Sequence, residues 1–137
     1  MTGEDDTTRA VLAANERFYR AFNEGDLAAM DELWAARSPV ACLHPGDSLI
    51  VGRQQVLRRW REILVSRPPF TLRCDGPTVQ LFGTTAIVYC YEGGNDDLAH
   101  LAVTNVFVRE GDAWHMVHHH AGPMVVPLTA TTPNDLN

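Results

Sequence analysis

The stretch "AVTNVFVREGDAWHMVHHHAGP", residues 102–123, holds the pattern that decides the fold. Apolar and polar residues alternate along most of both halves, and this two-residue period is typical of β-strands. Between the halves, the letters "GDAW" predict a tight turn, centred on residues 110–112. The stretch therefore predicts a β-hairpin with strands over residues 99–109 and 113–121.

Strand alternation splits the three consecutive histidines of this hairpin into two sets. One face is expected to carry Trp114, Met116, His118 and His120, with Thr104 opposite His118. Because this face is apolar near the turn and polar beyond it, we expect it to line a cavity. The other face carries Leu101, Val103, Asn105, Phe107, Val117 and His119. It is too apolar for a solvated surface, so it predicts a homodimer interface.

Helical patterns dominate the first half of the chain. Apolar residues recur every three or four positions over residues 7–23 and 26–36, and again in a third segment that follows Gly52 and ends at Pro68-Pro69. Further strands are predicted over residues 40–44, 70–74 with a possible continuation to 82, and 85–92. The expected fold class is α+β, with three N-terminal helices packed on a strongly curved antiparallel sheet.

Length and charge limit the classes of function. The 137 residues predict one domain over residues 7–123, between a disordered N-terminus (1–6) and a flexible C-terminal tail (124–137). A net charge of -6 disfavours nucleic-acid binding, and no apolar run approaches the roughly 20 residues that a membrane helix needs. The three cysteines have no paired spacing, which favours reduced thiols and a cytoplasmic protein.

Four stretches together resemble the SnoaL-like branch of the nuclear transport factor 2-like superfamily. They are "FYRAFNEGDLAAMDELWA" (18–35), "VACLHPGDSLIVGRQQVLRRWREIL" (40–64), "TAIVYCYE" (85–92) and the hairpin stretch itself. The resemblance implies a cone, in which three helices close a bent sheet around an internal apolar cavity, and a homodimer formed through the outer face of the sheet. Such relatives include ketosteroid isomerases, polyketide cyclases, dehydratases and non-catalytic kinase association domains, so the fold alone does not choose a function.

Candidate catalytic residues come from the histidines and from one carboxylate. His118 or His120 is expected to relay a proton, with His44 or Glu92 as its partner, because imidazole titrates near neutral pH. His44, His118 and His120 would also suit a zinc ion, but the competing interpretation is a hydrogen-bonded polar pocket, and we predict no metal. Ligand-binding walls are expected from Tyr19, Trp34, Trp60, Thr104, Trp114 and Met116.

These residues predict a protein that binds a small apolar organic molecule. The favoured hypothesis is an enzyme of the cyclase, isomerase or dehydratase type that transfers protons through its histidines. The alternative is a non-catalytic ligand-binding or association module that dimerises through its sheet. No cofactor is expected, because the sequence has no glycine-rich phosphate loop or nucleotide-binding fingerprint.

Overall fold

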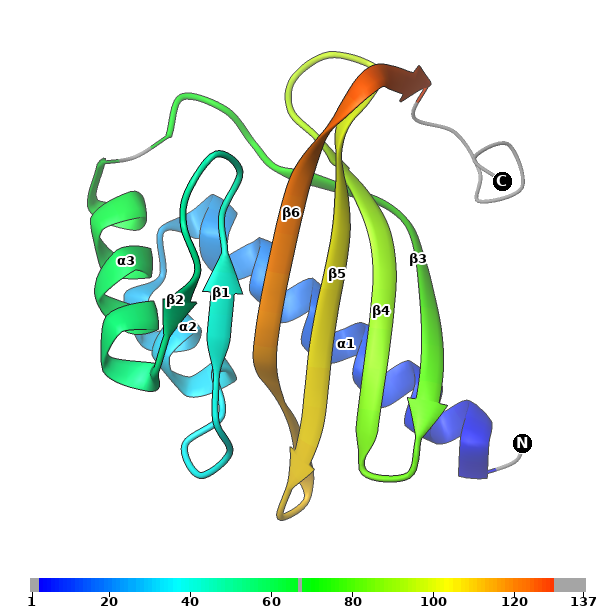
Figure 1. The fold of residues 1–137 in the computed structure, drawn as a ribbon. Coiled ribbons are helices and arrows are strands. Elements are labelled where there is room, and N and C mark those ends of the chain that lie inside the picture. Colours follow the sequence, from blue (N-terminus) through cyan, green and yellow to red (C-terminus); the bar gives the residue numbers. More distant parts are fainter. Residues whose placement is uncertain (1–2, 67, 130–137) are drawn as a thin grey trace.

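The computed structural model describes residues 3–66 and 68–129. Its helices are α1 (Gly3–Glu24), α2 (Leu27–Leu33) and α3 (Arg53–Ser66). Its strands are β1 (Ala41–Leu43), β2 (Ile50–Val51), β3 (Arg73–Phe82), β4 (Thr85–Gly93), β5 (Leu98–Glu110) and β6 (Ala113–Thr129). Figure 1 shows one sheet with the helices behind it, which confirms the predicted α+β fold class.

Helices α1 and α2 begin where the sequence supplies suitable end groups. Helix α1 begins at Gly3, before its predicted start at Thr7. Acidic side chains in its first turn stabilise the helix because they lie at the positive end of its dipole. Asp26 is the N-cap of α2, and its carboxylate accepts a hydrogen bond from the Ala29 N–H at 3.0 Å. Helix α2 ends at Leu33, before its predicted end, because the chain turns into an extended conformation there.

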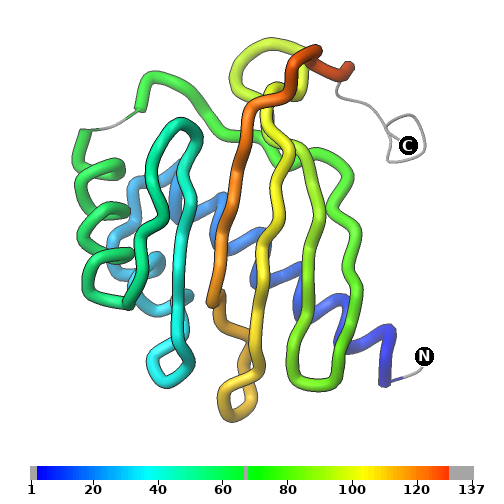
Figure 2. The backbone as a smooth tube through the Cα atoms, viewed as in Figure 1, coloured from blue at the N-terminus to red at the C-terminus, as the bar shows by residue number. Residues whose placement is uncertain are grey.

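The sheet has six strands in the order β2-β1-β6-β5-β4-β3. All neighbouring pairs are antiparallel except β1 and β6, which run parallel, so the sheet is mixed rather than wholly antiparallel. Figure 2 shows the backbone of β6 lying between β1 and β5. The central position of β6 makes its side chains decisive for both faces of the sheet.

Ordered elements extend past the predicted domain limits at residues 7 and 123. Residues 3–6 belong to α1, and β6 continues to Thr129. The described parts of the predicted disordered N-terminus and flexible tail are therefore helical and extended, respectively. The remaining parts of those two segments, residues 1–2 and 130–137, lie outside the described residues.

The core lies between the helices and the inner face of the sheet, which is the face that the helices cover (Figure 1). Large side chains at its centre, among them Phe18, Trp34, Phe107 and Met116, are less than 2% exposed. Burying each such side chain stabilises the fold by roughly 1.5–3 kcal/mol. This packing holds α1 across the sheet and fixes which strand residues face inward.

The β5–β6 hairpin has a shorter turn than predicted. Glu110 pairs with Ala113, so Gly111 and Asp112 alone form the turn, and Gly111 adopts a φ of 63° that favours glycine. The shorter turn changes the register of the hairpin. Together with a further irregularity between Val106 and Phe107, it pairs Thr104 with His120, two residues beyond the predicted partner.

A β-bulge in β6 separates the turn from the histidines. Phe107 pairs with Met116 and Val106 pairs with His118, so Val117 has no partner of its own on β5. The extra residue reverses the alternation of faces along the rest of the strand. Side chains after the bulge therefore face opposite to the direction that simple alternation predicts.

Candidate functional site

His119 lies on the inner face of β6, which is where the sequence pattern predicted His118 and His120. It is 3% exposed, and its Nδ1 lies 2.6 Å from Asn105 Oδ1. Its ring centre is 4.7 Å from that of Phe18 on α1. The expected orientation of His118 and His120 towards the helices is therefore wrong, because the bulge at Val117 reverses the two faces.

Asn105 determines which ring nitrogen of His119 carries the proton. The Asn105 Nδ2 group donates to Asn15 Oδ1 at 2.9 Å and to the Tyr19 hydroxyl at 3.3 Å. Its Oδ1 is therefore the acceptor, and His119 Nδ1–H is the donor. Burial, with a smaller contribution from the neighbouring imidazole of His44, lowers the pKa of His119 to about 3. His119 is thus a neutral imidazole at physiological pH.

Glu92 is a buried carboxyl group at the other end of the same hydrogen-bond network. It is 2% exposed, and its Oε2 accepts a hydrogen bond from the Tyr19 hydroxyl at 2.6 Å. Burial raises the pKa of Glu92 to about 7, although the bond from Tyr19 opposes this shift. Because this pKa matches physiological pH, Glu92 is suited to both releasing and accepting a proton.

His44 follows β1 and lies beside His119. Its ring centre is 4.7 Å from that of Trp60 and 6.3 Å from that of His119. Burial and the nearby Arg59 guanidinium lower the pKa of His44 to about 4. The structure thus brings His44 next to His119, and not to the predicted cluster with His118 and His120.

A hollow of about 370 Å³ lies between α1 and β3, above this network. Its lining combines apolar, polar and charged side chains, namely Leu12, Asn15, Glu16, Tyr19, Arg20, Cys74 and Pro77. Its volume lies within the range of small-molecule sites in proteins. Tyr19 therefore connects the hollow to the buried carboxyl group of Glu92.

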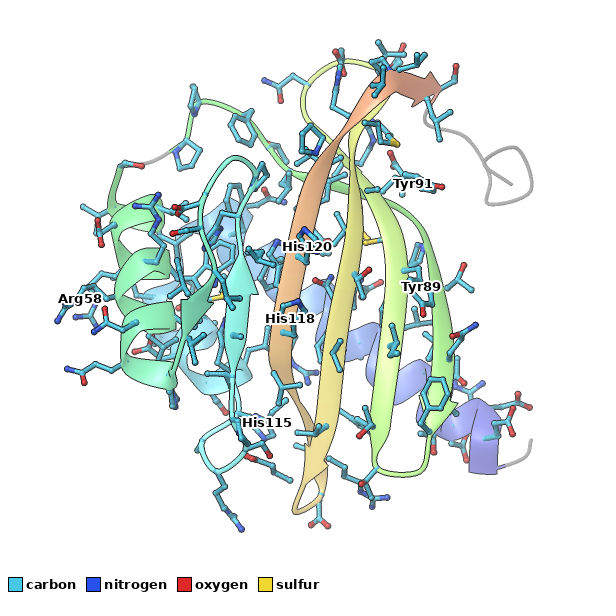
Figure 3. The ribbon with its side chains drawn as sticks, in the orientation of Figure 1. Arg58, Tyr89, Tyr91, His115, His118 and His120 are labelled. Carbon is cyan, nitrogen blue, oxygen red and sulfur yellow. The ribbon has the colours of Figure 1, made fainter. Side chains whose placement is uncertain are left out.

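His118 and His120 lie on the outer face of the sheet, away from the helices (Figure 3). The His118 Nδ1–H donates to the Ala41 carbonyl at 3.1 Å, and burial lowers the pKa of His118. His120 and Thr104 line a second hollow, of about 550 Å³, together with Tyr89 and Tyr91. These side chains form a surface that is separate from the network around Tyr19.

The remaining predicted ligand-binding residues lie in different parts of the protein. Trp34 and Met116 are 1% and 0% exposed, and their backbones pair where the loop after α2 meets β6. Trp114 is 6% exposed and borders a groove between α1, α2 and the hairpin. Two of the predicted ligand-binding residues contact the network described above. Tyr19 donates a hydrogen bond to Glu92, and the Trp60 ring packs beside the rings of His44 and His119.

Three members of the network, namely Asn15, Asn105 and His119, were not predicted as site residues from the sequence. Asn15 lies four residues after Val11 and four before Tyr19, so helical spacing could have placed it on the buried stripe of α1. Asn105 was recognised on an apolar strand face, but that face was interpreted as a dimer interface. In the structure this face, with Leu101, Val103 and Phe107, packs against the helices, so the predicted composition of the interface is wrong.

Within residues 3–66 and 68–129, the structure has no group of three or more histidine, cysteine or acidic side chains placed to hold a metal ion. In the same ranges, no helix is both long enough and apolar enough to cross a membrane. The described site carries imidazole, carboxyl, phenol and thiol groups.

Comparisons with known proteins agree on the fold. The family model of the SnoaL-like domain matches residues 11–127. A candidate dehydratase of the NTF2-like family from Streptomyces avermitilis has a similar structure, with 29% identity and a TM-score of 0.82, covering 90% of this chain and 99% of that one. A candidate calcium/calmodulin-dependent protein kinase type II association domain from Thiobacillus denitrificans is 34% identical, with a TM-score of 0.70, covering 82% of this chain and 93% of that one.

One curated protein, the F-box protein SKIP8 of Arabidopsis thaliana, is 29% identical over 120 residues. The match covers 88% of this chain but 52% of the plant protein. The chain thus spans about half the length of that relative.

Proposed function

Because the chain belongs to the SnoaL-like family of the NTF2-like superfamily, we propose that it is an enzyme that binds a small organic molecule and transfers protons through Tyr19 and Glu92. One observation carries the proposal. A buried carboxyl group with a pKa near 7 is hydrogen-bonded at 2.6 Å to a phenol that lines a hollow of suitable size.

The Tyr19–Glu92 pair can exist in two states of similar free energy at neutral pH. When Glu92 is ionised, the Tyr19 hydroxyl donates to it and the Tyr19 oxygen accepts from Asn105 Nδ2, so one oxygen lone pair remains for a ligand. When Glu92 is protonated, it donates to the Tyr19 oxygen, and the Tyr19 O–H is free to donate to a ligand. The pair can therefore accept a proton from a substrate or return one to it, as isomerisation and dehydration require.

Asn105 and His119 support the phenol in this proposal. Asn105 donates to the Tyr19 oxygen, and the neutral His119 ring fixes the orientation of the Asn105 amide. Both side chains are fully enclosed, so they hold Tyr19 in place without competing for the ligand. His44 and Trp60 complete the aromatic wall beside His119.

Proton transfer can be measured before the natural substrate is known. The protein is incubated in D₂O with 2-tetralone, a small apolar ketone with acidic α-hydrogens, and exchange of those hydrogens is followed by NMR. We expect protein-dependent exchange that is lost in Glu92→Gln and strongly reduced in Tyr19→Phe. An equal rate in Glu92→Gln would contradict the assignment. His118→Gln and His120→Gln serve as matched controls and should retain the wild-type rate, because their side chains lie on the outer face.

The second candidate function is association through the outer face of the sheet. It is supported by the 41% exposure of Tyr89 and by the hollow that Tyr89 shares with Tyr91 and His120. The similarity to a kinase association domain supports it as well. On this proposal the protein is a homodimer, and Tyr89→Glu should convert it to a monomer in sedimentation equilibrium. The three free cysteines support a cytoplasmic location for either function.

A further inference from the structure

Two cysteines meet beneath the hollow between α1 and β3. Cys74 pairs with Glu92 across the β3–β4 ladder, so Cys90 lies two residues along the same inner face. The interaction between the two thiols lowers the pKa of Cys74 and raises that of Cys90. We propose that Cys74 and Cys90 form a peroxide-reactive dithiol, in which a hydroperoxide oxidises Cys74 and Cys90 then closes a disulfide.

The two thiols differ in access and in ionisation, as the proposal requires. Cys74 is partly exposed, lines the hollow and accepts a hydrogen bond from Asn15 Nδ2 at 3.5 Å. Hydrogen bonds from Cys90 and Asn15 lower the pKa of Cys74, which favours the nucleophilic thiolate. Cys90 is 4% exposed, and its contact with Cys74 and its burial raise its pKa. Cys74 is therefore the attacking group, and Cys90 is the resolving thiol.

The third cysteine provides a contrast within the same chain. Cys42 on β1 is 0% exposed, and burial raises its pKa to about 12. Its sulfur lies 3.4 Å from His44 Nε2. A buried thiol of this kind is unreactive, because little thiolate forms and an oxidant has no access to it.

The reaction balances in two steps. The Cys74 thiolate attacks the hydroperoxide, an S–O bond forms, the O–O bond breaks, and the leaving oxygen takes a proton to become water or an alcohol. Cys90 sulfur then attacks the Cys74 sulfenic acid, an S–S bond forms, and the S–O bond breaks. The departing hydroxide takes the Cys90 proton and leaves as water. The two thiols lose two electrons in total, and the hydroperoxide gains them.

Oxidation would also alter the surroundings of Tyr19. The Cys90 sulfur lies 3.3 Å from the Tyr19 oxygen, whose own proton is donated to Glu92 when that carboxyl is ionised. A disulfide removes the Cys90 proton beside Tyr19 and also changes the sulfur that Asn15 contacts. The dithiol therefore adjoins the Tyr19–Glu92 pair at two points.

Mass spectrometry of the folded wild-type protein tests the proposal without any variant. The protein is treated with a small molar excess of hydrogen peroxide, free thiols are then alkylated, and the digested peptides are mapped. We expect loss of two hydrogen atoms, a cross-linked Cys74–Cys90 peptide pair, and Cys42 recovered as a free thiol. Circular dichroism before and after treatment checks that the fold persists.

Three results would overturn the proposal. They are oxidation of Cys42 as fast as that of Cys74, no oxidation of Cys74, and a wild-type protein that stops at the Cys74 sulfenic acid with Cys90 free. Cys90→Ser gives a second measurement. In this variant the Cys74 sulfenic acid should persist and react with dimedone, whereas Cys42→Ser should form the disulfide at the wild-type rate.

Discussion

The inner and outer faces of β6 place identical residues in opposite surroundings. His119 is 3% exposed and hydrogen-bonded to Asn105, whereas the adjacent His120 is exposed beside Tyr89 and Tyr91. Burial lowers the pKa of His119 to about 3 and keeps its ring neutral. The chemistry of each histidine thus follows from the face it occupies, and one bulged residue, Val117, determines that face.

The largest expected difference between the two faces of β6 is in the free energy of unfolding of their variants. His119→Ala removes a buried ring and leaves Asn105 Oδ1 without its donor, so we expect a loss of about 3 kcal/mol in the free energy of unfolding. His120→Ala is the matched control on the outer face, and it should change that free energy by no more than about 0.5 kcal/mol. Urea unfolding of both variants measures the difference. Equal losses would show that the two faces are assigned incorrectly.

The pH dependence of stability should separate the buried groups. The pKa values of His119 and His44 are lowered on folding to about 3 and about 4, so both groups bind fewer protons in the folded state than in the unfolded state. Their contribution therefore makes the free energy of unfolding rise with pH up to about 6.5. Glu92 acts in the opposite direction. Its pKa is raised to about 7, so the folded state holds an extra proton, and stability falls as pH rises from about 4.5 to 7.

Glu92→Gln removes the opposing contribution. Its free energy of unfolding should therefore rise with pH more steeply than that of the wild type between pH 5 and 6.5, by up to about 1.4 kcal/mol per pH unit. Urea unfolding at several pH values gives both slopes. Parallel wild-type and variant curves would mean that Glu92 titrates normally in the folded protein. Glu62→Gln, on an exposed position of α3, is the control and should leave the slope unchanged.

The smallest expected effect concerns His118 on the outer face. Its Nδ1–H donates to the Ala41 carbonyl and ties β6 to the short strand β1. His118→Ala should lower the free energy of unfolding by about 1 kcal/mol, which is the typical contribution of one hydrogen bond. In this variant, the amide hydrogens of residues 41–43 should exchange faster than those of β4. A loss as large as that of His119→Ala would place His118 in the core instead.

Local patterns predicted the elements better than the faces. The helical spacing of Phe18 and Phe22 and the turn at Gly111 depend on nearby residues, so they can be read from the sequence. The bulge has no such local cause. Before it, Met116 accepts a hydrogen bond from the Ala35 N–H at 2.9 Å, and after it, His118 pairs with Ala41 of β1. The reversal thus accompanies contacts between residues that lie about 80 positions apart in the chain. The sequence of β6 alone cannot predict such contacts.

The candidate site was predicted in part for the same reason. Glu92 and Tyr19 were both named from the sequence, and they lie 2.6 Å apart. Their partnership and the raised pKa of Glu92 depend on how deeply α1 packs against β4. Asn15 and Asn105 belong to the same network, but their role depends on a contact between α1 and β5 that only the tertiary structure supplies.

The central claim is that the Glu92 carboxyl is poised to exchange protons near neutral pH. The most direct test is an NMR titration of the Glu92 side-chain carboxyl carbon in the folded protein. The structure predicts a midpoint of about 7, because burial disfavours the charged carboxylate despite the bond from Tyr19. A midpoint near 4.5, the ordinary value for glutamate, would contradict the account.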